Sequence, residues 1–222
     1  MLPLSTSGRT DAPWVPPMTD LADEDRVRGN VYALLGNLLA AAPDARLLEV
    51  LSSVAPEPDD DSLLAASWQM LALAAARADL AQLREEYDAL FIGLGRGEVV
   101  PYGSWYLTGF LMEQPLAQLR GDLRELGIER QPGVHEPEDH AAALCDTMAL
   151  LITGETPVTL ERQFDFYARH LETWLPRFFR DLQKAESARF YRAVGQLGEQ
   201  FIGVESQAFR VSTPAAGAAT PS

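Results

Sequence analysis

The chain has 222 residues, 47% of them hydrophobic, which is enough for one folded domain and excludes a wholly disordered chain. Its 32 acidic and 18 basic residues give a formal charge of −14. Such a surface repels nucleic acid and anionic lipid, because binding to both depends on Lys and Arg that neutralise phosphates. It attracts a basic partner instead, although solubility alone also explains an acidic composition.

No run of apolar residues reaches the roughly 18 that a membrane span requires. The longest, around 63–78, is interrupted by Ser67, Gln69 and Arg77. The N-terminus has no basic region followed by an apolar core, and Cys145 is the single cysteine, so no internal disulfide can form. We therefore expect a cytoplasmic protein without membrane insertion.

Most of the chain has apolar residues at three- and four-residue spacing, which is typical of helices, and no stretch alternates as a strand does. The ends, 1–18 and 212–222, are rich in small and polar residues and are expected to be disordered. The region 19–211 is expected to form one domain. The expected helices cover about 20–42, 45–54, 64–71, 80–91, 104–112 and 116–127, then begin at Pro137 and Pro157, after a boundary at Pro176, and near Ser187.

These segments predict an all-α fold, a compact single-domain bundle of about nine or ten helices with short connections. Pro137 and Pro157 suit the first position of a helix, because the N–H group that proline lacks would have no helical partner there. The glycine-rich stretch 93–101 is expected to be a loop.

The histidines do not form a recognisable metal site. His135 and His140 are five residues apart and straddle Pro137, so they do not share a helical face as zinc ligands on one helix would. A site made of Glu138, Asp139 and His140 is conceivable, but adjacent residues point in different directions around a helix. We expect neither a metal nor another cofactor.

The sequence also contains no recognisable set of catalytic residues. Gly93, Gly95 and Gly97 lack the spacing of a nucleotide-binding loop. Cys145 lies within an expected helix with no basic neighbour to lower its pKa. We expect no enzyme; a nucleotide or metal-dependent hydrolase is the third-ranked alternative.

One unusual segment is 101–106, where Tyr102, Trp105 and Tyr106 follow the glycine-rich loop. Aromatic rings with polar tips suit a groove that grips an extended peptide. They equally suit a helix start with its rings turned into the core, and for Trp105 the two readings are about even.

The other unusual segment is 136–140, with three carboxylates and His140 around Pro137. Acidic residues in the first turn of a helix are favoured by the helix dipole, by roughly 0.3–1 kcal/mol each. The same carboxylates also form a dock for arginine, whose planar guanidinium binds them bidentately. Periodicity does not choose between these readings.

Four blocks of the chain, in order, resemble the TorD/DmsD/NarJ family of redox-enzyme maturation chaperones. Residues 87–91 resemble its Tyr-x-x-Leu-Phe element, and 101–106 its proline–aromatic–serine–tyrosine turn. Residues 137–140, Pro-Glu-Asp-His, match its most characteristic motif, and 164–182 resemble its C-terminal helix pair. Family members often carry a glutamate soon after the Asp-His pair, whereas this chain has only Asp146 there.

The resemblance implies a TorD-like helical chaperone. Such proteins bind the twin-arginine signal peptide or an N-terminal segment of a molybdoenzyme subunit and hold the subunit in the cytoplasm until its cofactor is inserted. The glycine loop and the Gly-Ser-Trp-Tyr stretch resemble a subgroup associated with formate dehydrogenases. The peptide-binding residues implied are Tyr102, Ser104, Trp105, Tyr106, Glu136, Glu138, Asp139 and His140.

A twin-arginine peptide is basic at one end and apolar in its middle, so carboxylates beside aromatic rings would complement both parts. The expectation depends on the segment after Pro137 facing the turn that begins at Pro101. The alternative is a generic helical adaptor unrelated to molybdoenzymes. Either protein could be a monomer or a homodimer.

Overall fold

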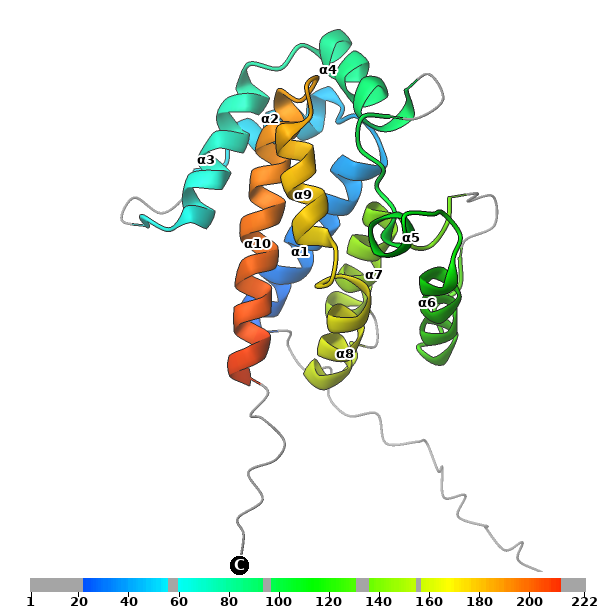
Figure 1. The fold of residues 1–222 in the computed structure, drawn as a ribbon. Coiled ribbons are helices and arrows are strands. Elements are labelled where there is room, and N and C mark those ends of the chain that lie inside the picture. Colours follow the sequence, from blue (N-terminus) through cyan, green and yellow to red (C-terminus); the bar gives the residue numbers. More distant parts are fainter. Residues whose placement is uncertain (1–21, 56–59, 94–96, 131–135, 155–156, 213–222) are drawn as a thin grey trace, which may run out of the picture.

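The computed structural model describes residues 22–55, 60–93, 97–130, 136–154 and 157–212. Within these ranges the chain forms ten α-helices, one π-helical turn and no β-strand, which confirms the predicted all-α class (Figure 1). No helix in the described part is long and apolar enough to cross a membrane. The expected disordered arm 1–18 and most of the expected tail lie outside the described residues.

The elements follow the predicted order. They are α1 (Asp23–Ala40), α2 (Ala45–Ser52), α3 (Leu63–Ala76), α4 (Leu80–Tyr87), the π-helical turn η1 (Asp88–Ile92), α5 (Gly103–Thr108), α6 (Gln114–Glu125), α7 (Ala141–Thr153), α8 (Leu160–His170), α9 (Leu175–Lys184) and α10 (Phe190–Ser212).

The predicted helix starts at Pro137 and Pro157 are wrong. Helix α7 begins after His140, whose Nδ1 accepts a hydrogen bond from the N–H of Ala142 at 3.1 Å. Helix α8 begins after Thr159, whose hydroxyl accepts from the backbone of the first turn. A side-chain acceptor satisfies the first free N–H groups of a helix and so defines where the helix starts. Pro137 and Pro157 therefore lie in the segments before the capping residues and not in the helices.

The predicted helix 104–112 also ends early, at Thr108. Gly109 adopts a left-handed backbone conformation with φ of 82°, which terminates α5. The hydroxyl of Thr108 then accepts from the N–H of Phe110 at 3.2 Å and holds the turn. Met112 also has a positive φ, 59°, which is rare for a residue with a side chain.

The bundle is built around the packing of α1 against α7 and of α10 against α9 and α3 (Figure 1). Two glycines of α1 let it approach α7 closely. A Cβ atom at Gly29 would lie 2.3 Å from a methyl carbon of Thr153, and one at Gly36 would lie 2.2 Å from a carboxylate oxygen of Asp146. The core between these helices contains large aromatic side chains: Tyr32, Tyr167, Trp174, Phe178, Phe179 and Tyr191.

A buried ion pair ties the first helix to the last. Arg28 on α1 binds Glu205 on α10 bidentately, with N–O distances of 2.8 and 3.0 Å, and also donates to Asp25 at 2.7 Å. Glu205 is buried, so losing either partner would leave an uncompensated charge inside the bundle. This contact fixes the relative position of α1 and α10.

We predict that Gly198→Ala destabilises the fold by about 1–3 kcal/mol through overpacking. A Cβ atom at Gly198 of α10 would lie 2.3 Å from the ring of Phe179, which is fully buried on α9. Gly203, on the same helix, has open space around its Cβ position. Gly203→Ala is the matched control and should stabilise by roughly 0.5–1 kcal/mol. Urea denaturation measures both, and equal midpoints for the two variants would contradict this packing.

Candidate functional site

The segments 101–104 and 139–141, predicted to face each other, are joined by backbone hydrogen bonds. The N–H of Gly103 donates to the carbonyl oxygen of Asp139 at 2.9 Å, and the N–H of Ala141 donates to that of Pro101 at 2.8 Å. Tyr102 and His140 form an isolated antiparallel bridge at the same point. We call this contact the junction. It places the start of α5 beside the start of α7.

Asp139 holds the junction through its side chain. One carboxylate oxygen accepts from the N–H of Ser104 at 2.8 Å, and the residue is only 3% exposed. Among the described residues, neither its other carboxylate oxygen nor the buried hydroxyl of Ser104 has a hydrogen-bond partner. The side chains of Asp139 and Ser104 are therefore buried at the junction and do not face solvent.

The rings of His140 and Tyr102 pack against each other at the junction. Their ring centroids are 5.1 Å apart, edge to face. His140 is 8% exposed. Burial lowers the pKa of His140 to about 4, although the neighbouring Asp139 acts in the opposite direction. The imidazole is therefore neutral at pH 7, as its cap on α7 requires.

The remaining acidic residues differ in their surroundings. Glu136 is exposed, and its carboxylate accepts a hydrogen bond from the hydroxyl of Tyr102. Glu138 is largely covered and forms an ion pair with Arg120 of α6 at 2.8 Å. Of the carboxylates predicted to bind peptide, Glu136 is the one that faces solvent, and it lies beside Tyr102.

Tyr106 and Trp105 face a different part of the molecule. The ring of Tyr106 stacks on Trp174, with centroids 5.4 Å apart, and its hydroxyl donates to Asp181 of α9 at 3.1 Å. Burial raises the pKa of Tyr106, and the charge of Asp181 raises it further. Tyr106 and Trp105 line a pocket of about 220 Å³ against α9, which neither Tyr102 nor Glu136 lines.

An exposed apolar segment spans the last turn of α5 and the residues after Gly109, and sequence reasoning missed it by assigning all of these residues to a helix. Phe110 and Met112 are 68% and 72% exposed, and Leu107 and Leu111 are also exposed. The hydroxyl of Thr108 hydrogen-bonds to the backbone of Phe110 and stabilises the turn between Leu107 and the other three residues. We call Leu107, Phe110, Leu111 and Met112 the apolar turn. A run of three apolar residues directly after a glycine was the available sequence signal.

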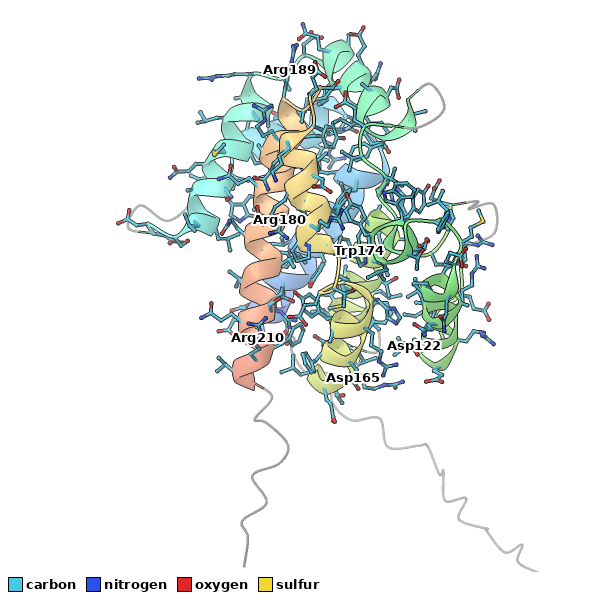
Figure 2. The ribbon with its side chains drawn as sticks, viewed as in Figure 1. Asp122, Asp165, Trp174, Arg180, Arg189 and Arg210 are labelled. Carbon is cyan, nitrogen blue, oxygen red and sulfur yellow. The ribbon has the colours of Figure 1, made fainter. Side chains whose placement is uncertain are left out.

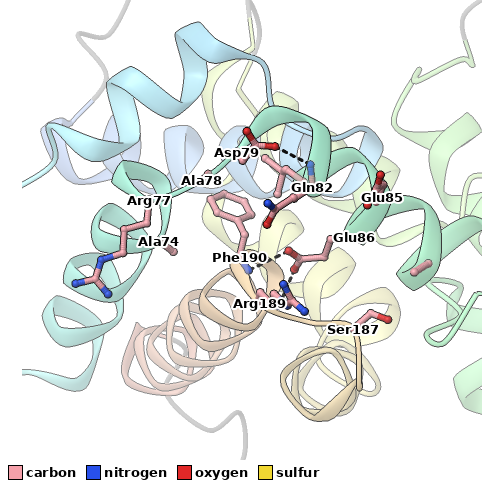
Figure 3. A pocket seen from close by; sticks show the side chains of 12 residues that line it. Ala74, Arg77, Ala78, Asp79, Gln82, Glu85, Glu86, Ser187, Arg189 and Phe190 are labelled. Atoms are coloured by element: carbon pink, nitrogen blue, oxygen red, sulfur yellow. Dashed lines mark hydrogen bonds between the residues drawn. The ribbon is translucent and has the colours of Figure 1, made fainter.

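A pocket of about 710 Å³ lies elsewhere, between α3, α4 and the start of α10 (Figure 3). None of the predicted site residues lines it. The carboxylate of Glu86 accepts from the N–H groups of Arg189, Phe190 and Tyr191 at 2.7, 3.2 and 2.8 Å. Glu86 thus caps α10 from a neighbouring helix, so its role there is structural.

The described residues include no group of three or more His, Cys, Asp or Glu side chains placed to hold a metal ion. His135 lies outside these residues. Burial raises the pKa of the Cys145 thiol, which keeps it protonated and unreactive.

The family model for the nitrate reductase delta subunit matches residues 57–180, so the chain belongs to this family. It is 31% identical to the chaperone protein TorD of Vibrio cholerae serotype O1 (strain ATCC 39541) over 130 residues, 54% of this chain and 59% of that protein, and thus spans less than two thirds of this relative. It is 26% identical to the chaperone protein TorD of Shewanella loihica over 212 residues, 86% of this chain and 97% of that protein.

The fold is also similar to the crystal structure of a redox enzyme maturation protein from Archaeoglobus fulgidus. The TM-score is 0.54, with 16% identity, and the match covers 88% of this chain and 99% of that chain. At this identity the likeness concerns the fold alone.

We predict that Asp139→Ala destabilises the protein by about 2 kcal/mol, because the buried N–H of Ser104 loses its acceptor. Asp165→Ala, at an exposed position of α8, removes the same charge and should change stability by no more than roughly 0.5 kcal/mol. Chemical denaturation compares them. An Asp139→Ala variant as stable as the control would show that this carboxylate does not hold the junction.

We predict an acid-dependent loss of stability that originates at His140. Its folded pKa of about 4 lies below the ordinary 6.5, so the unfolded chain binds the extra proton between these values. The free energy of unfolding should fall by about 3 kcal/mol from this residue as the pH drops from 6.5 to 4. His140→Asn keeps a capping side chain and should flatten this slope in urea titrations. Parallel slopes for the two proteins would refute the assignment.

Proposed function

We propose that this protein is a maturation chaperone for a molybdoenzyme subunit, one that binds the subunit's twin-arginine signal peptide or N-terminal segment in the cytoplasm until its cofactor is inserted. Relatives named chaperone protein TorD support this class. The observation that carries the proposal is the position of exposed Glu136, which is hydrogen-bonded to Tyr102 at the junction. Tyr102 is followed along the chain by the apolar turn.

The two surfaces have complementary tasks. Glu136 supplies a solvent-facing carboxylate for a client arginine, and its hydrogen bond to Tyr102 holds it in place. The apolar turn supplies exposed side chains for an apolar stretch of the client. Helix α5 has six residues and rises about 1.5 Å per residue, so roughly 9 Å of helix lies between Tyr102, the partner of Glu136, and the residues after Gly109. An extended peptide covers that distance in about three residues.

Electrostatics assist the encounter. With a formal charge of −14, the chain attracts a basic segment over distances up to about a Debye length, roughly 8 Å at physiological salt. Added salt weakens this attraction but barely affects apolar contacts. A client that is basic at one end and apolar in its middle is therefore selected by both terms.

The test uses a synthetic peptide with two adjacent arginines followed by an apolar run, with binding measured by calorimetry. Wild-type protein should bind it, and Glu136→Gln should weaken binding roughly threefold to tenfold. Glu49→Gln, an exposed change on α2 that removes the same charge, is the control and should leave the affinity near wild type. Equal affinities for Glu136→Gln and Glu49→Gln would remove Glu136 from the binding site.

Client identity is tested by mass spectrometry of proteins that co-purify with the chain from its native cells. A molybdoenzyme precursor is expected, with a formate dehydrogenase subunit as the first candidate. Recovery of a different stable partner and no such precursor would favour a generic adaptor.

A further inference from the structure

The carboxylate of Glu138 is already occupied by arginines of the same chain. Arg120 of α6 reaches one carboxylate oxygen through Nε at 2.9 Å and through Nη2 at 2.8 Å. Arg130, after α6, places its Nε 3.8 Å from the other oxygen. The Glu138 side chain is only 17% exposed beneath them. Burial alone would raise the pKa of Glu138, but its hydrogen bond and charge interactions with the two arginines lower it overall.

Arg130 also reaches Glu136, the residue proposed to bind a client arginine. Its Nη1 lies 3.5 Å from the carbonyl oxygen of Glu136. The guanidinium of Arg130 therefore contacts both the Glu138 carboxylate and the main chain of Glu136, beside the position proposed for a client guanidinium.

Helix α6 does not need these ion pairs to stay in place. It buries Leu116, Leu119 and Leu123. Asp122, labelled in Figure 2, lies on the same helix. Its carboxylate accepts hydrogen bonds from His170 at 2.7 Å and from Arg169 at 2.9 Å on α8. The contacts of Arg120 and Arg130 with Glu138 are thus additional to the anchoring of α6.

We propose that Arg120 and Arg130 are internal competitors for the client's arginines, and that they set the affinity and selectivity of the site. This inference rests on the proposed function. A client guanidinium gains Glu138 only by displacing a resident one, so a single ion pair is exchanged for another of similar strength. Arg130, at the longer distance, is the first to be displaced.

Competition of this kind favours a client with two adjacent arginines. A single cation replaces Arg130 but leaves Arg120 bound to Glu138. Two guanidiniums can replace both residents, and one of them can reproduce the contact that Arg120 makes through two nitrogens of one guanidinium. Lysine ammonium groups bind as point charges and cannot reproduce it.

The experiment measures the affinity of the full chain for the peptide with two arginines and for the same peptide with two lysines. Arg120→Gln and Arg130→Gln should each raise affinity for the arginine peptide roughly twofold to fivefold. Arg124→Gln, on the same helix, makes the same change in charge; its hydrogen bond goes to the carbonyl oxygen of Arg120, not to Glu138. Arg124→Gln therefore shows how much of any gain in affinity comes only from the loss of one positive charge.

A second set of variants tests whether any gain in affinity depends on the Glu138 carboxylate. In a Glu138→Gln background, Arg130→Gln should raise the affinity for the arginine peptide no more than Arg124→Gln does. In that background there is no Glu138 carboxylate for the loss of Arg130 to free. Melting curves confirm that each variant is folded. If wild type binds the arginine peptide but Arg120→Gln and Arg130→Gln match Arg124→Gln or bind more weakly, the competition is refuted and the proposed function stands. If wild type binds neither peptide, the proposed function itself fails.

Discussion

The candidate site depends on the junction, the short set of hydrogen bonds that joins the start of α5 to the start of α7. The N–H of Gly103 donates to the carbonyl oxygen of Asp139, the N–H of Ala141 donates to that of Pro101, and the Asp139 carboxylate accepts from the N–H of Ser104. These residues are more than thirty positions apart in sequence, and both helices begin at the contact. Because each helix start is fixed by the other segment, Tyr102 and the 136–140 carboxylates keep one arrangement.

The acidity of the chain is unevenly available to partners. Glu205, Glu86 and Asp139 are buried and bind groups of the protein itself. Glu138 is covered by Arg120. The formal charge of −14 therefore describes the long-range field, whereas short-range recognition at the proposed site would depend on Glu136, the carboxylate of the 136–140 segment that faces solvent.

The fold class and the order of helices could be predicted from sequence because apolar spacing and capping residues act locally. The errors at Pro137 and Met112 came from single residues that outweigh spacing, namely the His140 cap and the left-handed Gly109. The proximity of 101–106 to 136–140 was expected only from family resemblance. The burial of Asp139 and the pairing of Glu138 could not be predicted, because they depend on tertiary contacts.

The cap that His140 places on α7 also decides what its outer nitrogen can offer. Because Nδ1 accepts from Ala142, the hydrogen of the neutral ring sits on Nε2, and this tautomer can only donate there. A donor is matched to the carbonyl oxygens of a passing polypeptide and mismatched to a guanidinium. In the proposed site, the main chain of any client could satisfy this donor, whereas the Glu136 carboxylate would favour a cationic side chain. Binding of the client's backbone and selection of its arginine would then be tasks of two neighbouring residues.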